Sequence, residues 1–379
     1  MIDNKKIAHV LMSDYLVDSR VTNETVSLHK NGFDVVVFCI KSRVFNSDEV
    51  RNNIHIKRFG LIGNKAFKII TAWIGMIYYS HRMKIKCVHA HDITALPVAY
   101  LISRIKRVPL IYDSHELWTE SHHKFNSRLV VKIVGFFEKI LAKKAAMIIT
   151  VSDSIKNHLC NHFDVKNITV IRNIPSYTHN GDYDIFRENY NIKPDAKILI
   201  YQGFIDFSRG VDLIIDAAIT VCHANPNCFF FILGDGPDLI ELKAKVKGIG
   251  LTDRIVFIGF VDQVDLLKYT KSADIGIHAI KNSCLNHEYC LPNKLFEYIH
   301  SGIVPVVTDL VELGGFVKSH KIGLAFKNES VSALEGVLLR LISDNDLFNE
   351  LKSNLINTSE QVTWDNEFIK LKEVYTKVL

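Results

Sequence analysis

The residues best suited to chemistry lie in residues 281–309, KNSCLNHEYCLPNKLFEYIHSGIVPVVTD. A proline just ahead of Asn293 and a glycine at Gly302 are typical of the start and end of a helix, and the apolar run that follows predicts a strand. Glu297 comes four residues after Asn293 and three after Lys294, so the three side chains share one helix face. Because the free N–H groups at a helix N-terminus attract anions, this combination of cation, amide and carboxylate indicates a nucleotide or a sugar phosphate as ligand.

Glycine turns follow three other expected strands in the second half of the chain. They are Gly203 with Arg209 and Gly210, then Gly234, Asp235 and Gly236, then Gly259 with Phe260. Glycine allows a backbone to approach a ligand, and an arginine offers phosphate a fixed fork of donors. The second turn begins like a dinucleotide-binding fingerprint but has Leu239 where the third glycine belongs. We expect the three turns to lie at one edge of a sheet.

Polar residues follow three expected strands in the first half. They are Asp18, Ser19 and Arg20, then His89, His91 and Asp92, then Asp113, His115 and Glu116. A histidine just past a strand and flanked by carboxylates can transfer protons or form hydrogen bonds with a ligand, which makes His115 the candidate here. The chain has 17 histidines, and a structural role for any one of them stays open.

Short β-branched runs alternate with helix-period segments, which predicts an α/β fold with parallel sheets and crossover helices. A length of 379 residues suits two domains. We expect doubly wound domains at 1–172 and 196–363, a linker and hinge at 173–195, and a last helix at 364–379 that crosses back to the first domain. Two such domains would face each other across a ligand cleft. The expected strands are 7–12, 33–40, 54–59, 87–91, 110–112, 147–151, 168–172, 198–201, 229–233, 255–258, 275–278, 304–307 and 324–326.

Several classes of site are disfavoured by the sequence. The seven cysteines are scattered and form no C-x-x-C pair, which argues against a disulfide framework or a zinc site and for reduced thiols in the cytosol. The N-terminus lacks the apolar segment of a signal peptide, and the longest apolar run, 69–79, is shorter than the ~20 residues of a spanning helix. The Asp-x-Asp triplets at 182–184 and 344–346 fall in the linker and in a surface turn. We therefore expect no metal.

The net charge of +5 is unevenly distributed. Residues 1–180 carry a net charge of +12 and the remainder carries −7, so the first half is the candidate for an anionic partner. Residues 65–86 and 128–144 are both basic and apolar, as in helices that lie on anionic membranes. An ordinary helix packed on its own sheet is the alternative for either segment. Nothing indicates a nucleic acid partner.

The order of these marks resembles the retaining glycosyltransferases of the GT-B fold, family 4. It runs strand-DSR, HAHD, YDSHELW, IRN, GFxxxxRG, GDGP, GF and LPNKLFEYIHSGIVPVV, and covers nearly the whole chain. The most specific marks are YDSHE and PNKLFEY. The resemblance implies two Rossmann-like domains, with a nucleotide-sugar donor held mainly by the C-terminal one and an acceptor by the N-terminal one. It also implies that no metal is needed.

By position, the resemblance implies roles for single residues. Arg209 matches the basic residue before Gly210 that binds diphosphate, Glu297 matches the second glutamate of an E-x7-E motif that holds the ribose, and His115 matches a histidine near the transferred sugar. We therefore expect His115, Arg209 and Lys294 to be catalytic. The expected donor-binding residues are Gly203, Gly210, Gly234, Asp235, Gly236, Phe260, Asn293, Glu297, Tyr289 and Glu288. The expected acceptor-side residues are Asp18, Arg20, His91 and Asp92.

Three positions depart from the family pattern. The first glutamate of E-x7-E falls at Tyr289, with Glu288 beside it. Phe204 replaces a frequent arginine, so Lys294 is the candidate for the missing cation. The segment 18–20 stands where the family often has a glycine pair.

These observations predict a retaining glycosyltransferase that moves a hexose or N-acetylhexosamine from a nucleoside-diphosphate donor, most simply a UDP-sugar. The expected acceptor is a lipid-diphosphate-linked saccharide, and the resemblance implies a setting in the synthesis of bacterial lipopolysaccharide or capsule. The expected location is the cytoplasm, at the inner face of the plasma membrane. A GT-B sugar-nucleotide epimerase and a non-catalytic nucleotide-sugar binding protein are the alternatives.

Overall fold

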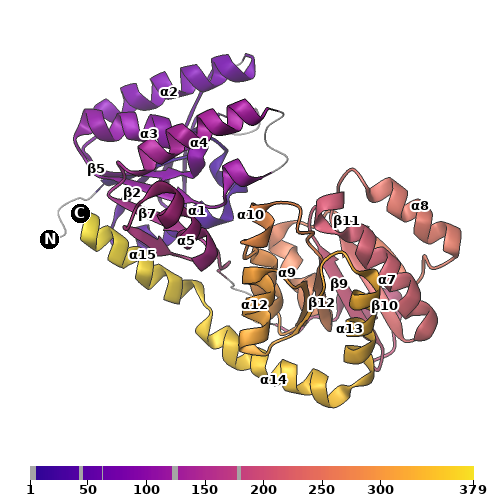
Figure 1. Ribbon diagram of the computed structural model, residues 1–379. Helices are drawn as coiled ribbons and strands as arrows, with labels where there is room; N and C mark the ends of the chain where they lie inside the picture. The colour runs from indigo at the N-terminus through magenta and orange to yellow at the C-terminus, as the bar shows by residue number, and fades with distance from the viewer. Residues whose placement is uncertain (1–5, 42–45, 62, 122–126, 177–180) are drawn as a thin grey trace. The chain divides into compact units, whose positions relative to one another are not determined.

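The computed structural model describes residues 6–41, 46–61, 63–121, 127–176 and 181–379. The chain divides into two compact units (Figure 1). The first is coloured indigo to magenta and includes the yellow helix at the C-terminus, and the second runs from pink to yellow. The first unit comprises Met1–Pro175 and Trp364–Leu379, and the second comprises Ser176–Thr363. Each has its own sheet and its own core. In the described part of the chain, every helix is too short or too polar to cross a membrane.

The first unit is built on an eight-stranded sheet with the order β3-β4-β2-β1-β5-β6-β7-β8. Its strands are β1 Lys6–Val10, β2 Asp34–Ile40, β3 Asp48–Arg51, β4 Ile54–Phe59, β5 Ile85–His91, β6 Leu110–Ser114, β7 Met147–Thr150 and β8 Ile168–Val170. All neighbours are parallel except β3 and β4. The carboxyl ends of β1, β5 and β6 therefore lie side by side.

The second unit has a six-stranded parallel sheet with the order β11-β10-β9-β12-β13-β14. Its strands are β9 Lys197–Gln202, β10 Cys228–Leu233, β11 Ile255–Gly259, β12 Ile275–His278, β13 Val304–Thr308 and β14 Leu324–Phe326. Apolar runs such as CFFFIL in β10 are almost wholly buried, as in a sheet covered by helices on both faces. The expected α/β architecture is confirmed.

Helices connect the strands in both units. In the first unit they are η1 Tyr15–Val17, α1 Ser19–Lys30, α2 Lys65–His81, α3 Asp92–Lys106, η2 Trp118–Glu120, α4 Arg128–Ala142, α5 Asp153–Phe163 and α15 Trp364–Val378. In the second they are α6 Ile185–Tyr190, η3 Phe207–Arg209, α7 Val211–Ala224, α8 Leu239–Ile249, α9 Gln263–Lys271, α10 Leu285–Glu288, α11 Asn293–His300, α12 Val311–His320, α13 Val331–Ser343 and α14 Asn345–Gln361. Helix α11 begins at Asn293, the expected position.

Helix α15 completes the core of the first unit. Its side chains Trp364, Phe368 and Tyr375 are buried in one cluster with residues of β1 and β2. The Trp364 indole donates to Ser27 Oγ at 2.8 Å. The far end of the sequence is therefore part of the first unit.

Two elements differ from the sequence prediction. Strand β3 was not expected; its sequence DEVR is short and mostly polar, and it pairs antiparallel at the sheet edge. The segment expected to be a linker contains α6, whose Phe186 is fully buried and stacks on Phe231 with ring centroids 3.9 Å apart. Arg187 also pairs with Asp274 at 2.9 Å, so aromatic packing and an ion pair fix this polar segment to the second unit. Residues 177–180 of that segment lie outside the described residues.

Candidate functional site

The glycine turns after β9, β10 and β11 lie at one edge of the second sheet and line a cavity of about 700 Å³. Its lining residues are Gly203, Phe204, Leu233, Gly234, Asp235, Gly236, Pro237, Phe260, Val261 and Leu266. Phe204 and Phe260 are 57% and 75% exposed, which is unusual for phenylalanine. Exposed aromatic faces beside an apolar cavity suit a flat ring as ligand.

The turns pack too closely for side chains. Gly203 donates its N–H to Leu233 O at 2.9 Å, and Gly234 donates to Gly259 O at 2.7 Å. Gly234 has a φ of +137°, and a β-carbon there would stand 1.8 Å from Gly203 O. The three strand ends are thus joined into one backbone-lined wall.

Two cations meet beside this wall. Lys294 lies in the first turn of α11 and Arg209 ends η3, immediately before α7. Burial lowers the pKa of Lys294, and the nearby charge of Arg209 lowers it further, while Glu297 opposes both. Arg209 Nε is buried and has no hydrogen-bond partner among the described residues. A diphosphate placed here would relieve the repulsion and accept from the free donor.

Glu297 is the carboxylate of the same helix face. It accepts a hydrogen bond from Gln202 Nε2, and Gln202 Oε1 in turn accepts from Thr270 Oγ1 at 2.7 Å. Gln202 and Thr270 are 1% and 0% exposed, whereas Glu297 is half-buried. Burial raises the pKa of Glu297, although Lys294 and Gln202 counteract it. Its carboxylate is therefore held in a fixed orientation and can accept hydrogen bonds from the hydroxyl groups of a ligand.

Two residues of this region were not predicted. Gln202 is the polar last residue of the otherwise apolar strand KILIYQ, and that contrast could have indicated it. His278 ends β12, is fully buried, and neither ring nitrogen has a hydrogen-bond partner among the described residues. Burial, then Lys294 and Arg209, lower the pKa of His278 well below its usual value. It is a neutral side chain beside the two cations.

Glu288 is hydrogen-bonded within the second unit. Its carboxylate accepts from the Asn282 side chain and, at 3.3 Å, from the Val311 N–H at the start of α12. Glu288 therefore joins two loops, and its donor-binding role stays a prediction. Tyr289 caps the short helix α10 and is half-buried.

In the first unit, His115 lies between two carboxylates just after β6. Its Nε2 is 3.1 Å from Asp113 Oδ2, and its Nδ1 is 3.5 Å from Asp92 Oδ2. Burial alone would lower the pKa of His115, but Asp92 and Asp113 outweigh it and raise the pKa to about 10. Its side chain is 16% exposed, so a charged imidazolium reaches the surface at this sheet edge.

Two of the expected acceptor-side residues are buried. Arg20 is 1% exposed; its Nε and Nη2 donate to Asp113 at 2.8 and 3.0 Å, and Nη1 donates to Ile171 O at 2.9 Å. His91 is 3% exposed and bonds to His9 at 2.8 Å. Both side chains are therefore buried and paired within the first unit, which strand-end position alone does not reveal, and their acceptor-side role stays a prediction.

The other two acceptor-side residues are closer to solvent. Asp18 accepts from the Val21 N–H at 3.2 Å and so caps α1. Asp92 begins α3 with a φ of +62°, its side chain is 28% exposed, and it accepts from the His115 N–H at 3.2 Å. Asp92 and His115 are thus the pair at this edge that a ligand can reach.

Known proteins resemble the chain in both halves. Family models for "Glycosyltransferase Family 4" and "Glycosyl transferases group 1" match residues 17–174 and 182–361. The alpha-D-kanosaminyltransferase of Streptomyces kanamyceticus is 29% identical over 54% of this chain and 55% of its own length. The alpha-monoglucosyldiacylglycerol synthase of Acholeplasma laidlawii is 21% identical over 57% and 58%. The chain spans about half the length of these curated relatives.

Solved structures share the fold over almost the full chain. Anabaena Alr3699/HepE, in complex with UDP and glucose, has a TM-score of 0.79 at 16% identity and covers 98% of this chain and 100% of its own. The sucrose-phosphate synthase of Thermosynechococcus elongatus has a TM-score of 0.79 at 15% identity and covers 99% of both chains. With the two family models together matching most of both units, the chain belongs to the family 4 glycosyltransferases and has their GT-B fold.

Proposed function

We propose that this protein is a retaining glycosyltransferase that moves a hexose or N-acetylhexosamine from a UDP-sugar to a hydroxyl of a lipid-linked saccharide. The observation that carries the proposal is the pairing of Arg209 with Lys294 beside the oriented carboxylate of Glu297. Together with the cavity lined by Phe204 and Phe260, these residues match the base, the ribose and the diphosphate of a nucleotide-sugar in that order. The base would bind in the cavity, the ribose hydroxyls would donate to Glu297, and the diphosphate would bind to Arg209 and Lys294.

Catalysis would rest on stabilising the leaving group. Negative charge grows on the diphosphate as the glycosidic bond breaks, and Arg209 and Lys294 are fixed where it develops. The free N–H groups of the first turn of α11 add to this field. A phosphate oxygen of the leaving group can accept the proton of the acceptor hydroxyl on the same sugar face. This route retains the anomeric configuration and needs neither an enzyme nucleophile nor a metal.

The first unit would position the sugar and the acceptor. The protonated His115 would donate to a sugar hydroxyl, and the carboxylate of Asp92 would accept from one. Since a histidine with a pKa of about 10 holds its proton at neutral pH, His115 is a donor and not a general base.

Helix α4 supports contact with an anionic membrane. Its exposed apolar side chains include Leu129 at 67%, Phe136 at 62% and Phe137 at 56%, whereas only Glu138 and Ala142 are buried among its residues. Helix α4 contacts its own sheet through Glu138, which accepts from the Tyr112 hydroxyl of β6 at 2.6 Å, but its large apolar side chains are exposed, which supports the membrane proposal. Four lysines accompany the apolar side chains, namely Lys132, Lys139, Lys143 and Lys144. Helix α2 exposes Ile70, Ile74 and Tyr78 in the same way.

An acceptor anchored in lipid would be brought to the enzyme by this surface. We place the protein at the cytoplasmic face of the plasma membrane, in the synthesis of lipopolysaccharide or capsule. The Acholeplasma relative is named as the synthase of a monoglucosyldiacylglycerol, a lipid that carries a sugar, which fits an acceptor embedded in lipid.

Donor binding is the first test. A thermal-shift panel of UDP-, GDP-, ADP- and dTDP-sugars should raise the melting temperature for UDP-sugars, because a ligand that binds only the folded state stabilises it. Transfer to lipid-linked saccharides is then measured with the sugar that binds. Epimerised nucleotide sugar formed without acceptor, or tight binding without any transfer, would contradict the proposal.

A further inference from the structure

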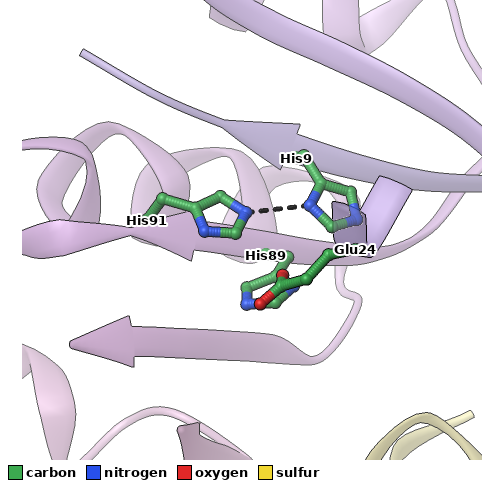
Figure 2. Close-up of side chains that lie close together, drawn as sticks. All are labelled: His9, Glu24, His89 and His91. Carbon is green, nitrogen blue, oxygen red and sulfur yellow. Dashed lines mark hydrogen bonds between the residues drawn. The ribbon is translucent and has the colours of Figure 1, made fainter. Parts of the chain in front are cut away.

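Four ionisable side chains meet inside the first unit, away from solvent (Figure 2). They are His9 on β1, Glu24 on α1, and His89 and His91 on β5. His9 and His89 are register partners on neighbouring parallel strands, and His91 lies two residues further on the same face. Their exposed fractions are at most 3%, and one ligand atom from each lies within 4.8 Å of the others.

Each imidazole has one nitrogen in the cluster and the other fixed from outside. His9 Nδ1 and His91 Nε2 face each other at 2.8 Å. The Tyr375 hydroxyl is 2.6 Å from His89 Nδ1 and 3.3 Å from His9 Nε2, and His91 Nδ1 is 3.5 Å from the carboxylate oxygen Oδ2 of Asp113. Metal-binding histidines show this pattern, because the outer hydrogen bond fixes the tautomer and orients the ring.

The inner atoms lack hydrogen-bond partners. Both carboxylate oxygens of Glu24 and Nε2 of His89 are buried and make no hydrogen bond among the described residues. The cation nearest to Glu24 is Arg20, with Nε 3.2 Å from Oε1, but its hydrogen bonds go to Asp113 and Ile171. Buried polar atoms are nearly always paired in proteins, so a partner for these atoms is missing.

We propose that His9, Glu24, His89 and His91 bind one divalent transition metal ion, with zinc as the best match. Three imidazole nitrogens and one carboxylate oxygen form a closed tetrahedral set of the kind that zinc prefers. Binding would replace the His9–His91 hydrogen bond and move those nitrogens to roughly 3.3 Å, the spacing set by two ~2.0 Å bonds.

The ion would have a structural role and would be separate from the transfer reaction. It would join β1, α1 and β5 and, through Tyr375, would fix α15 to them. The competing explanation is that no ion binds. Glu24 would then be protonated, and its O–H group would donate a hydrogen bond to His89 Nε2.

Metal content decides between the two. The full-length protein is stripped with a chelator, reloaded with excess zinc, desalted and analysed by mass spectrometry for metals. We expect about one zinc per chain in the wild type and none in His89→Gln. The double variant His158→Ala/His162→Ala removes a stacked pair on α5, with ring centroids 5.2 Å apart, and should keep the zinc. Less than a tenth of an equivalent in the wild type, or loss only in the α5 variant, would overturn the proposal.

A spectroscopic readout covers the case in which His89→Gln fails to fold. Cobalt added to the stripped wild type should give the intense visible bands of a tetrahedral site, and their absence would overturn the proposal. Tyr375→Phe keeps all four ligands but removes the outer hydrogen bonds of His9 and His89. It should weaken zinc binding by about 10–100-fold, measured by competition with a chelating dye. Unchanged affinity would mean that the cluster seen here is not the binding site.

Discussion

The Lys294 side chain lies directly against the backbone of Gly203. A β-carbon at Gly203 would stand 2.3 Å from Lys294 Cε and 2.8 Å from Nζ, and Gly203 has a φ of +142°. The absence of a side chain at one strand end thus sets the position of a cation on another element. The position of the Lys294 ammonium group therefore depends on the glycine at position 203.

Gly203→Ala should therefore weaken UDP binding by roughly tenfold or more, equivalent to about 1.4 kcal/mol, by displacing the Lys294 ammonium and straining the turn. Isothermal titration calorimetry measures the change. Gly336→Ala is the matched control, because Gly336 lies in α13 with open space around it. Equal UDP affinity in both variants would contradict a role of the Gly203–Lys294 contact in UDP binding.

Arg209→Ala and Lys294→Ala should each lower kcat/KM by about 10²–10³, because each removes a fixed charge from the leaving diphosphate. The fold-loss of kcat/KM in the double variant should be smaller than the product of the two single fold-losses, since neighbouring charges act together. The control is Lys245→Ala, which breaks a partly exposed ion pair with Asp216 in the same unit and should leave the rate unchanged. Full activity in either single variant would remove that residue from the site.

Arg20→Met tests the structural role that burial gives to Arg20. The change leaves Asp113 buried without its bidentate partner, which should cost about 3–5 kcal/mol of unfolding free energy. Urea denaturation followed by fluorescence measures the loss. Lys57→Met removes a partly exposed pair with Asp48 and should cost less than about 1 kcal/mol. A stable Arg20→Met protein with a changed acceptor preference would restore the original acceptor-side prediction.

The stability of the first unit should depend on pH through His115. The folded protein raises the pKa of His115 from 6.5 to about 10, with Asp92 and Asp113 outweighing burial. The proton is thus held more tightly in the folded state, so its stabilisation is complete below about pH 6.5 and is lost as the pH rises through about 10. We expect His115→Gln to be less stable than wild type by on the order of 2–4 kcal/mol at pH 6.

Melting curves from pH 6 to pH 10 give the readout. The difference between wild type and His115→Gln should shrink as the pH rises, whereas His223→Gln, at an exposed position in α7, should follow the wild type throughout. A constant difference across the range would mean that the His115 proton does not contribute to stability.

Membrane contact through α4 is tested with the double variant Phe136→Glu/Phe137→Glu. Losing two exposed aromatic groups and adding two negative charges should reduce binding to anionic vesicles by tenfold or more. Ile240→Glu/Ile356→Glu changes two apolar residues of the second unit, 82% and 64% exposed, and should bind as wild type does. Flotation assays measure both. Equal loss in the two variants, or no binding by the wild type, would contradict the proposal.

The pattern of alternating strands and helices could be predicted from the sequence because period and punctuation are local properties. Strand β3 could not, since DEVR has neither apolar alternation nor β-branched enrichment and forms only because β4 provides an edge. Helix α6 was also missed. It is too short to show a period, and its contacts with the core, through Phe186 and Tyr190 on Phe231, are tertiary.

The site residues differ in the same way: local spacing predicts some of them, and others depend on tertiary contacts. Lys294 and Glu297 could be predicted together because their spacing lies within a single helix turn. Arg20 and Asp113 are 93 positions apart, and only the sheet brings them into a buried pair. A charged residue at a strand end has the same sequence signature whether it meets a ligand or another part of the chain. The missing information is tertiary burial.

The position of α15 in the first unit has a consequence for synthesis. A ribosome would produce the entire second unit before the helix that carries Trp364 and Tyr375, so the second unit can fold while the core of the first remains open. Until α15 is made, the apolar side of α1 and of the neighbouring strands lacks its cover. Nascent first units would therefore be the species most in need of chaperones, although they emerge first.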